Sequence, residues 1–243
     1  MKTDIIYFNI ILLLILLFIS TRIGYIIRIL SVIYTKIIGL PTDTLSSKNW
    51  WQSAVRSQVS ITHDKEYEAC VFGDSITAPI GNTLGEDTFN FAIDGMSSIS
   101  LIEQLKILTA ANVRYKKAVI AIGTNDACYC TTNDIFVKNM KQIIALVKEM
   151  GATNIMLIPA FYSTIAASHN PLLAGTIARV EEINELLRQV AEAENVLILG
   201  ESVQPLFEGQ ALKENLTTDG VHLNTDGINI YRQALLKLLS SSL

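Results

Sequence analysis

Hydrophobic residues are distributed unevenly along this chain, and its first forty residues stand apart from the rest. Residues 5–20 read IIYFNIILLLILLFIS, with Asn9 as the only clearly polar side chain inside the run. A membrane span takes about 20 helical residues, a length that is reached at Ile27 if Arg22 extends its charge to the lipid headgroups. No small-residue cleavage pattern follows the run. The pattern therefore predicts an uncleaved N-terminal transmembrane helix, with a buried helix of a soluble core as the alternative.

The next segment, residues 23–40, has a different pattern. Its aliphatic residues recur with helical spacing, whereas Arg28 and Lys36 fall between them. This pattern is typical of a basic amphipathic helix at a membrane surface, and a helix packed on the protein's own domain fits it equally well. Pro41 ends the segment. We assign residues 1–40 to a membrane anchor with an amphipathic extension.

Residues 41–63 are interpreted as a linker that carries a short helix. Trp51, Val55 and Val59 share one face of that helix. Trp50 and Trp51 are suited to the headgroup region of a membrane, and packing against the domain that follows is the alternative.

From residue 64 to residue 243 the pattern becomes regular and predicts one catalytic domain. Short apolar runs alternate with helical stretches, which indicates a parallel sheet with helices on both faces. The predicted strands are residues 69–72, 88–93, 118–122, 154–158 and 195–199, and the predicted helices are residues 99–110, 134–150, 177–193 and 227–239. In such sheets reactive groups gather at the carboxyl ends of the strands.

Composition narrows the function classes. The net charge is −4 and residues 64–243 contain no cluster of Lys and Arg, which argues against nucleic acid as a partner. The cysteines, Cys70, Cys128 and Cys130, are too few for a disulfide framework. A zinc site needs three or four ligands at recurring spacings, and no histidine lies near Cys128 and Cys130. We therefore interpret all three cysteines as ordinary thiols.

Ser75 directly follows the first predicted strand, in Gly73-Asp74-Ser75. A serine that enters a helix from a strand is well placed to act as a nucleophile, because free N–H groups at the helix start stabilise an oxyanion. Gly73 would keep the turn free of a side chain where a substrate approaches. The alternative is that Ser75 or Thr77 only caps a helix.

Two further strand ends carry hydrogen-bond donors. Asn125 lies in Gly123-Thr124-Asn125-Asp126 after the third predicted strand, and its side-chain amide can donate to developing negative charge. Gly95 follows the second predicted strand and can offer a backbone N–H at the same edge. An Asx turn and a simple turn glycine are the alternatives for these two positions.

Asp219 and His222 stand three residues apart in Asp219-Gly220-Val221-His222 near the C-terminus. This spacing lets the carboxylate reach the imidazole, which fixes the tautomer and leaves the other ring nitrogen free to accept a proton from serine. His63 and His169 have no such partner at this spacing.

Taken in order, these four motifs resemble the four sequence blocks of the SGNH hydrolases, also called GDSL esterases/lipases, over roughly residues 67–240. The resemblance implies a triad of Ser75 as nucleophile, His222 as base and Asp219 as the acid that orients it. It implies an oxyanion hole made by the backbone of Ser75 and Gly95 and by the side chain of Asn125.

The resemblance also implies an α/β fold: a flavodoxin-like three-layer α/β/α sandwich with a parallel sheet, here preceded by the predicted transmembrane helix. Position 77 is Thr, so the G-x-S-x-G motif of the α/β-hydrolases is absent around Ser75. The implied activity is a serine esterase on acyl or acetyl esters of lipids or glycans, which needs no metal or cofactor. The alternatives are an O-acyltransferase on the same triad and a non-catalytic membrane-anchored binding or assembly protein.

Asp94 departs from the family pattern, which usually has a small neutral residue before the glycine. We expect Asp94 to cap a helix that runs from Met96 and to point away from the oxyanion hole. The alternatives are that its carboxylate binds a cationic or polyol substrate, or that it opposes the developing charge.

The anchor leads to two expectations. Basic residues after the predicted span favour a cytoplasmic domain by simple counting, but the resemblance to exported relatives leads us to expect the extracytoplasmic side. Because no motif residue lies before Gly73, a chain beginning near Asp64 is expected to keep its activity on small esters.

Overall fold

A computed structural model of the chain describes residues 42–240. The predicted anchor and its amphipathic extension lie in residues 1–40, outside this described part, so they stay predictions. Within residues 42–240, no helix combines the length and the hydropathy that crossing a membrane requires.

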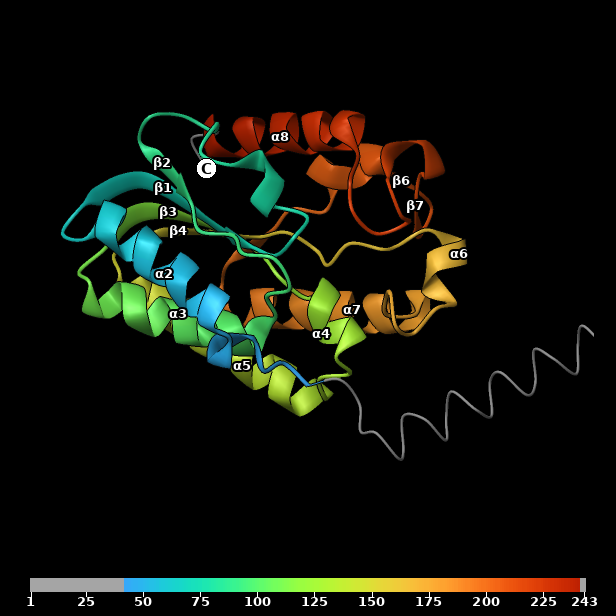
Figure 1. Cartoon of the computed structure of the whole chain (residues 1–243), viewed down its shortest axis with the longest axis horizontal. Coiled ribbons are helices and arrows are strands. Elements are labelled where there is room, and N and C mark those ends of the chain that lie inside the picture. The colour runs from blue at the N-terminus through green and yellow to red at the C-terminus, as the bar shows by residue number, and fades with distance from the viewer. Residues whose placement is uncertain (1–41, 241–243) are drawn as a thin grey trace, which may run out of the picture. The chain divides into compact units, whose positions relative to one another are not determined.

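A five-stranded parallel sheet forms the middle layer, which confirms the predicted sheet (Figure 1). Its strands lie in the order β2-β1-β3-β4-β5. They are β1 (Glu66–Gly73), β2 (Thr88–Asn90), β3 (Arg114–Ala121), β4 (Asn154–Leu157) and β5 (Leu197–Ile198). The carboxyl-terminal halves of β1 and β3 are apolar and buried, as expected for strands that are covered on both faces.

The helices form the two outer layers. Figure 1 shows α3 (Ser98–Ala110), α5 (Asn133–Glu149) and α7 (Ile177–Glu194) on one face of the sheet, and α8 (Thr225–Ser240) on the other. The connections that contain α3, α5 and α7 all run in the same direction along the sheet, so right-handed crossovers place them on the same face. The connection from β1 to β2 runs the opposite way, and its short 3-10 helix η2 (Ala78–Ile80) packs on the face of α8.

The observed strands differ in length from the predicted ones. The central strands β1 and β3 begin three and four residues earlier than predicted. The second and fifth predicted strands shorten to β2 and β5, which are edge strands with a neighbour on one side only. The hairpin of β6 (Phe207–Glu208) and β7 (Ala211–Leu212) was not predicted, because two-residue strands leave no period in the sequence. The remaining elements are α4 (Thr124–Cys128), α6 (Ile165–Ser168), η3 (Glu201–Leu206) and η4 (Glu214–Leu216).

The segment interpreted as a linker packs on the domain beside α3. It contains the 3-10 helix η1 (Leu45–Ser47) and α2 (Asn49–Thr62). Trp51 and Val55 are each 1% exposed and belong to the same core cluster as α3 and the sheet, whereas the adjacent Trp50 is 52% exposed. Of the two alternatives for Trp51, the structure shows packing against the domain.

Candidate active site

The sheet topology gathers the predicted motifs at one edge. From β1 the chain passes to β2 on one side, and it then crosses back to β3 on the other side of β1. The connections therefore leave in opposite directions at β1 and β3, which are hydrogen-bonded neighbours. In open α/β sheets such a point leaves a crevice at the carboxyl ends of the strands. The register pairs Gly73 with Ala121, so Ser75 and Gly123 leave the sheet at the same level.

Ser75, His222 and Asp219 form a continuous line of hydrogen-bonding groups. The Oγ atom of Ser75 lies 3.0 Å from Nε2 of His222. On the other side of the ring, Nδ1 of His222 lies 2.7 Å from Oδ2 of Asp219. The structure therefore brings together the three residues that the sequence singled out, although Ser75 and the other two lie at opposite ends of the domain sequence.

The loop before α8 holds Asp219 and His222 in place. The second carboxylate oxygen of Asp219 accepts hydrogen bonds from the backbone N–H groups of Val221 and His222, at 2.9 Å and 2.8 Å. Partial burial opposes ionisation of Asp219, but the hydrogen bonds from the His222 ring and from these N–H groups outweigh it and lower the pKa of the carboxyl. Asp219 is therefore ionised at neutral pH and can orient the imidazole.

Gly220 lets this loop pack closely against the start of α6. Its φ of +90° is unfavourable for other residues, and an added Cβ would lie 2.7 Å from Cβ of Ala167 and 2.8 Å from Oγ1 of Thr164. Thr164 donates its backbone N–H to the Gly220 carbonyl at 2.8 Å. The glycine is thus required by the packing of this loop against Thr164 and Ala167.

The turn that carries Ser75 differs from the predicted helix start. Only the three-residue η2 follows it, so the expected contribution of a helix dipole is absent at this position. Oδ1 of Asp74 accepts the Ile76 N–H at 3.0 Å and shapes the turn instead. The expectation for Gly73 also needs correction, because an added Cβ would meet the side chain of Thr77 at 2.5–2.6 Å. Gly73 therefore makes room for Thr77 rather than for a substrate.

Gly95 lies in a tight turn between β2 and α3. The Met96 N–H donates to the Ile93 carbonyl at 3.3 Å, with Asp94 and Gly95 at the two central positions. Gly95 has a φ of +76°, whereas Asp94 has a negative φ, which is the combination of a type II turn with glycine at its third position.

Asn125 is the second residue of α4, and it links the Gly95 turn to the Ser75 turn. Its amide nitrogen donates to the Met96 carbonyl at 3.0 Å and lies 3.4 Å from Oδ2 of Asp74. It therefore contacts the residues that adjoin Gly95 and Ser75. The three predicted oxyanion donors meet at the same edge of the sheet.

Two buried carboxyl groups beside the site were not identified from the sequence. Burial raises the pKa of Asp74 to about 7 and that of Asp126 to about 6. Asp126 accepts hydrogen bonds from the backbone N–H and the hydroxyl of Ser98, at 2.9 Å and 2.5 Å, and so attaches α4 to the start of α3. Nothing in the pattern of polar residues signals that these two carboxyl groups are buried.

The expected cap by Asp94 is wrong. Helix α3 begins at Ser98, and Ser97 caps it by accepting the Ile99 N–H. Asp94 is exposed and occupies the second position of the Gly95 turn. Asp94 lies too far before Ser98 to cap α3, because Ile93–Met96 forms a turn and not the first turn of the helix.

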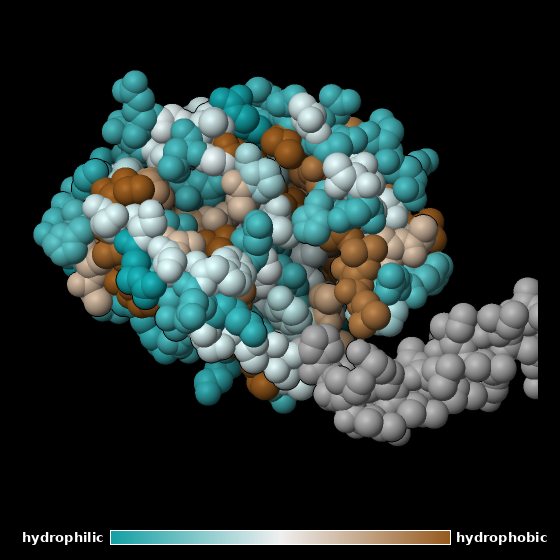
Figure 2. Space-filling view, viewed as in Figure 1, coloured by the Kyte–Doolittle hydropathy of each residue, from teal (hydrophilic) through white to brown (hydrophobic). Residues whose placement is uncertain are grey.

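Asp219 is one of the residues that line a hollow of about 400 Å³. It is lined mainly by small and polar residues of α6, the loop after α6 and the loop before α8, which are Thr164, Ala166, Ala167, Asn170, Leu173, Glu214, Thr217, Thr218, Asp219 and Gly220. Leu172 is 76% exposed and Ile165 is 60% exposed in the same part of the chain. Figure 2 shows hydrophobic surface over the segment between α6 and α7. Of Ser75, His222 and Asp219, only Asp219 lines this hollow.

Comparison with solved structures identifies the fold. A GDSL-like lipase from Bacteroides thetaiotaomicron is 17% identical, with a TM-score of 0.64, and the match covers 79% of this chain and 98% of that one. A lipase/acylhydrolase from Enterococcus faecalis is 20% identical, with a TM-score of 0.55 and coverage of 71% and 95%. An acetylxylan esterase from Geobacillus stearothermophilus is 17% identical, with a TM-score of 0.54 and coverage of 74% and 97%.

Sequence comparison identifies the family. A search of curated proteins finds no match for the chain. The sequence profile of the GDSL-like lipase/acylhydrolase family matches residues 71–229, which is more than half of the chain and includes all four motifs. The chain therefore belongs to the GDSL-like lipase/acylhydrolase family.

Proposed function

We propose that the protein hydrolyses carboxylic esters, with Ser75 as nucleophile, His222 as general base and Asp219 as the residue that orients His222. The observation that carries this proposal is the line of contacts from Ser75 Oγ to His222 Nε2 at 3.0 Å and from His222 Nδ1 to Asp219 Oδ2 at 2.7 Å. Distances of about 2.6–3.2 Å permit direct proton transfer.

The reaction proceeds in two steps. Ser75 gives its proton to His222 Nε2 while its oxygen attacks the ester carbonyl carbon, and Asp219 stabilises the imidazolium that results. The bond to the alcohol then breaks, His222 protonates the leaving oxygen, and an acyl-serine ester remains. Water, deprotonated by His222, attacks this ester and releases the carboxylic acid with Ser75 restored.

The negative charge of the tetrahedral intermediate is stabilised by the backbone N–H groups of Ser75 and Gly95 and by the amide of Asn125. One amide hydrogen of Asn125 stays with the Met96 carbonyl at 3.0 Å, and the other exchanges its long, 3.4 Å contact with Asp74 for the oxyanion. A buried carboxylate near these donors would oppose that charge. Since burial raises the pKa of Asp74 to about 7, this carboxyl is partly protonated at neutral pH and the repulsion is reduced.

The proposed substrates are acyl or acetyl esters of lipids or glycans. The side chains of His222 and Asp219 are 45% and 41% exposed, so the alcohol part of a large substrate can reach the triad. The structural neighbour that is an acetylxylan esterase acts on esters of this kind.

The test is turnover of p-nitrophenyl acetate together with labelling by a fluorophosphonate probe, which reacts with activated serines. Ser75→Ala should abolish labelling and nearly all turnover without unfolding the domain. Ser57→Ala removes an exposed serine on α2 and serves as the matched control, with both readouts unchanged. A folded Ser75→Ala protein that still hydrolyses the ester would rule out the proposed nucleophile.

A further inference from the structure

The Gly95 turn is contacted by side chains that lie outside the four motifs. Tyr129 donates its hydroxyl to the Gly95 carbonyl at 3.1 Å. Tyr129 follows the last residue of α4, and its N–H donates to the Asn125 carbonyl at 2.7 Å. Residues four apart on a helix share a face, so α4 directs two donors, Asn125 and Tyr129, at the successive carbonyls of Met96 and Gly95.

The hydroxyl of Tyr129 can act only as a donor to that carbonyl. Burial, with a smaller contribution from nearby acidic groups, raises the pKa of Tyr129 to about 12. The hydroxyl therefore keeps its proton throughout the neutral pH range, and the contact with Gly95 persists there.

Residues before the matched family region hold the other side of the turn. Oδ2 of Asp43 accepts hydrogen bonds from the Ser97 hydroxyl at 2.5 Å and from the Ser100 N–H at 3.2 Å. Its Oδ1 accepts the Leu45 N–H at 2.7 Å, and the Leu45 side chain lies 3.9 Å from the position that a Cβ on Gly95 would occupy. Asp43 thus fixes the chain directly after the turn and places Leu45 against Gly95.

We propose that Asp43, Leu45 and Tyr129, called the Gly95 brace below, are positioning residues that hold the Gly95 N–H in the direction required for oxyanion stabilisation. The proposal rests on the proposed esterase function. Glycine has no side chain to restrict its two backbone torsions, and an oxyanion donor is effective only when its direction is set before the reaction. The restriction must come from neighbouring groups, and the brace supplies it from both sides of the turn.

Tyr129→Phe tests this proposal in the full-length protein in detergent, with p-nitrophenyl acetate as substrate. The change removes one hydroxyl and leaves the ring in place. We expect kcat to fall roughly tenfold, less than the 10²–10³ lost with a whole donor, while KM is unchanged because the ground-state ester does not need the aligned N–H. The rate constant of fluorophosphonate labelling should fall by a similar factor, since that reaction also develops negative charge on an oxygen in the same hole.

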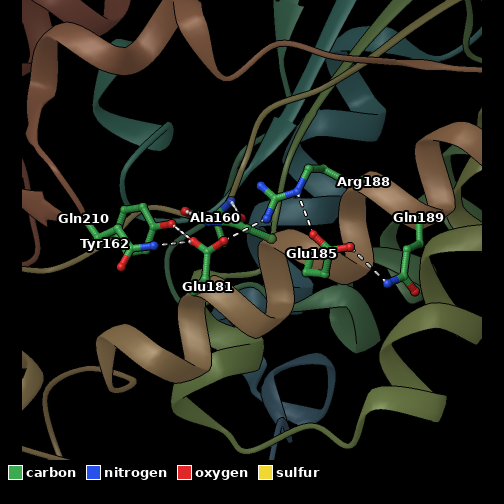
Figure 3. Close-up of polar contacts among 8 residues, drawn as sticks. Ala160, Tyr162, Glu181, Glu185, Arg188, Gln189 and Gln210 are labelled. Carbon is green, nitrogen blue, oxygen red and sulfur yellow. Dashed lines mark hydrogen bonds and ion pairs between the residues drawn. The ribbon is translucent and has the colours of Figure 1, made fainter.

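Tyr162→Phe is the matched control. Tyr162 is also partly buried, and its hydroxyl donates to Glu181 in a network with Arg188 and Gln210 on the surface of α7 and the β6–β7 hairpin (Figure 3). Tyr162→Phe removes a tyrosine hydroxyl, as Tyr129→Phe does, but it leaves the Gly95 turn unchanged. We expect its kcat and labelling rate to equal those of the unmodified protein.

Asp43→Asn provides a second variant, which keeps the shape of the side chain and removes its charge. A several-fold loss of kcat with unchanged KM is expected. Unchanged kcat in both Tyr129→Phe and Asp43→Asn would overturn the proposal, as would a loss confined to KM or an equal loss in Tyr162→Phe. Ser75→Ala, measured alongside, separates the two ideas: if it is inactive while both brace variants keep full kcat, only the brace is refuted, and if it stays active, the esterase proposal itself fails.

Discussion

Replacing Trp51 by alanine should destabilise the whole catalytic domain, although Trp51 lies before the first motif. The side chain is 1% exposed within the core cluster that includes Val55 and the α3 leucines. A buried indole removes roughly 150–250 Å² from water, which is worth about 4–6 kcal/mol at ~25 cal/mol per Å². Its Nε1 has no hydrogen-bond partner among residues 42–240, a defect that costs roughly 1–3 kcal/mol and disappears in the alanine variant. We therefore expect a loss of about 3 kcal/mol, at the low end of the range for such substitutions.

The assay is urea unfolding, followed by far-UV circular dichroism, of a chain beginning at Thr42, because residues from Thr42 onward form one compact unit. Trp50→Ala is the control, since Trp50 is 52% exposed and its loss should change the free energy of unfolding by no more than about 0.5 kcal/mol. A loss of about 3 kcal/mol is a large part of the roughly 5–15 kcal/mol that stabilises a domain.

The result also decides whether residues 42–63 can be removed. If Trp51→Ala and Trp50→Ala are equally mild, the reasoning from burial is wrong, and a chain beginning near Asp64 should keep its activity as the sequence alone suggested. If Trp51→Ala is costly, that shorter chain should fail to fold, because it loses Leu45, Trp51 and Val55 from the core together.

Two further predictions concern the site itself. Asn125→Ala should lower kcat by roughly 10²–10³ with little change in KM, as expected for an oxyanion donor; a loss in KM alone, measured with p-nitrophenyl acetate, would make Asn125 a ground-state binding residue. Asp74→Asn should change how stability depends on pH. Burial raises the pKa of Asp74 from 3.8 to about 7, so between these values the folded state holds a proton that the unfolded state has lost. Its contribution to stability is present below about pH 4 and is lost as the pH rises to about 7, by at most about 4 kcal/mol. Unfolding at pH 5 and pH 8 should show a smaller decline for Asp74→Asn, and an equal decline in both proteins would contradict the assignment.

Local sequence signals were enough to predict the layers of this fold and the residues that meet at its edge. Apolar runs of strand length alternate with helical periods, and this alternation specifies a parallel sheet covered on both faces. Because parallel strands all end at one edge, the motifs around Ser75, Gly95 and Asn125 had to come together there. The pair Asp219 and His222 is local as well, since one short loop sets the distance between them.

Tertiary structure alone decided which side of each element is buried and what surrounds each motif. Trp50 and Trp51 are neighbours of the same type, and only the position of α2 against α3 makes one exposed and the other part of the core. The raised pKa of Asp74 arises from its complete burial, which no spacing of polar residues encodes. The contacts of Asp43 and Tyr129 with the Gly95 turn join segments that are distant in sequence. Periodicity and motif spacing determine local structure, over one helix, strand or loop. Burial and contacts between distant segments depend on the packing of the whole domain.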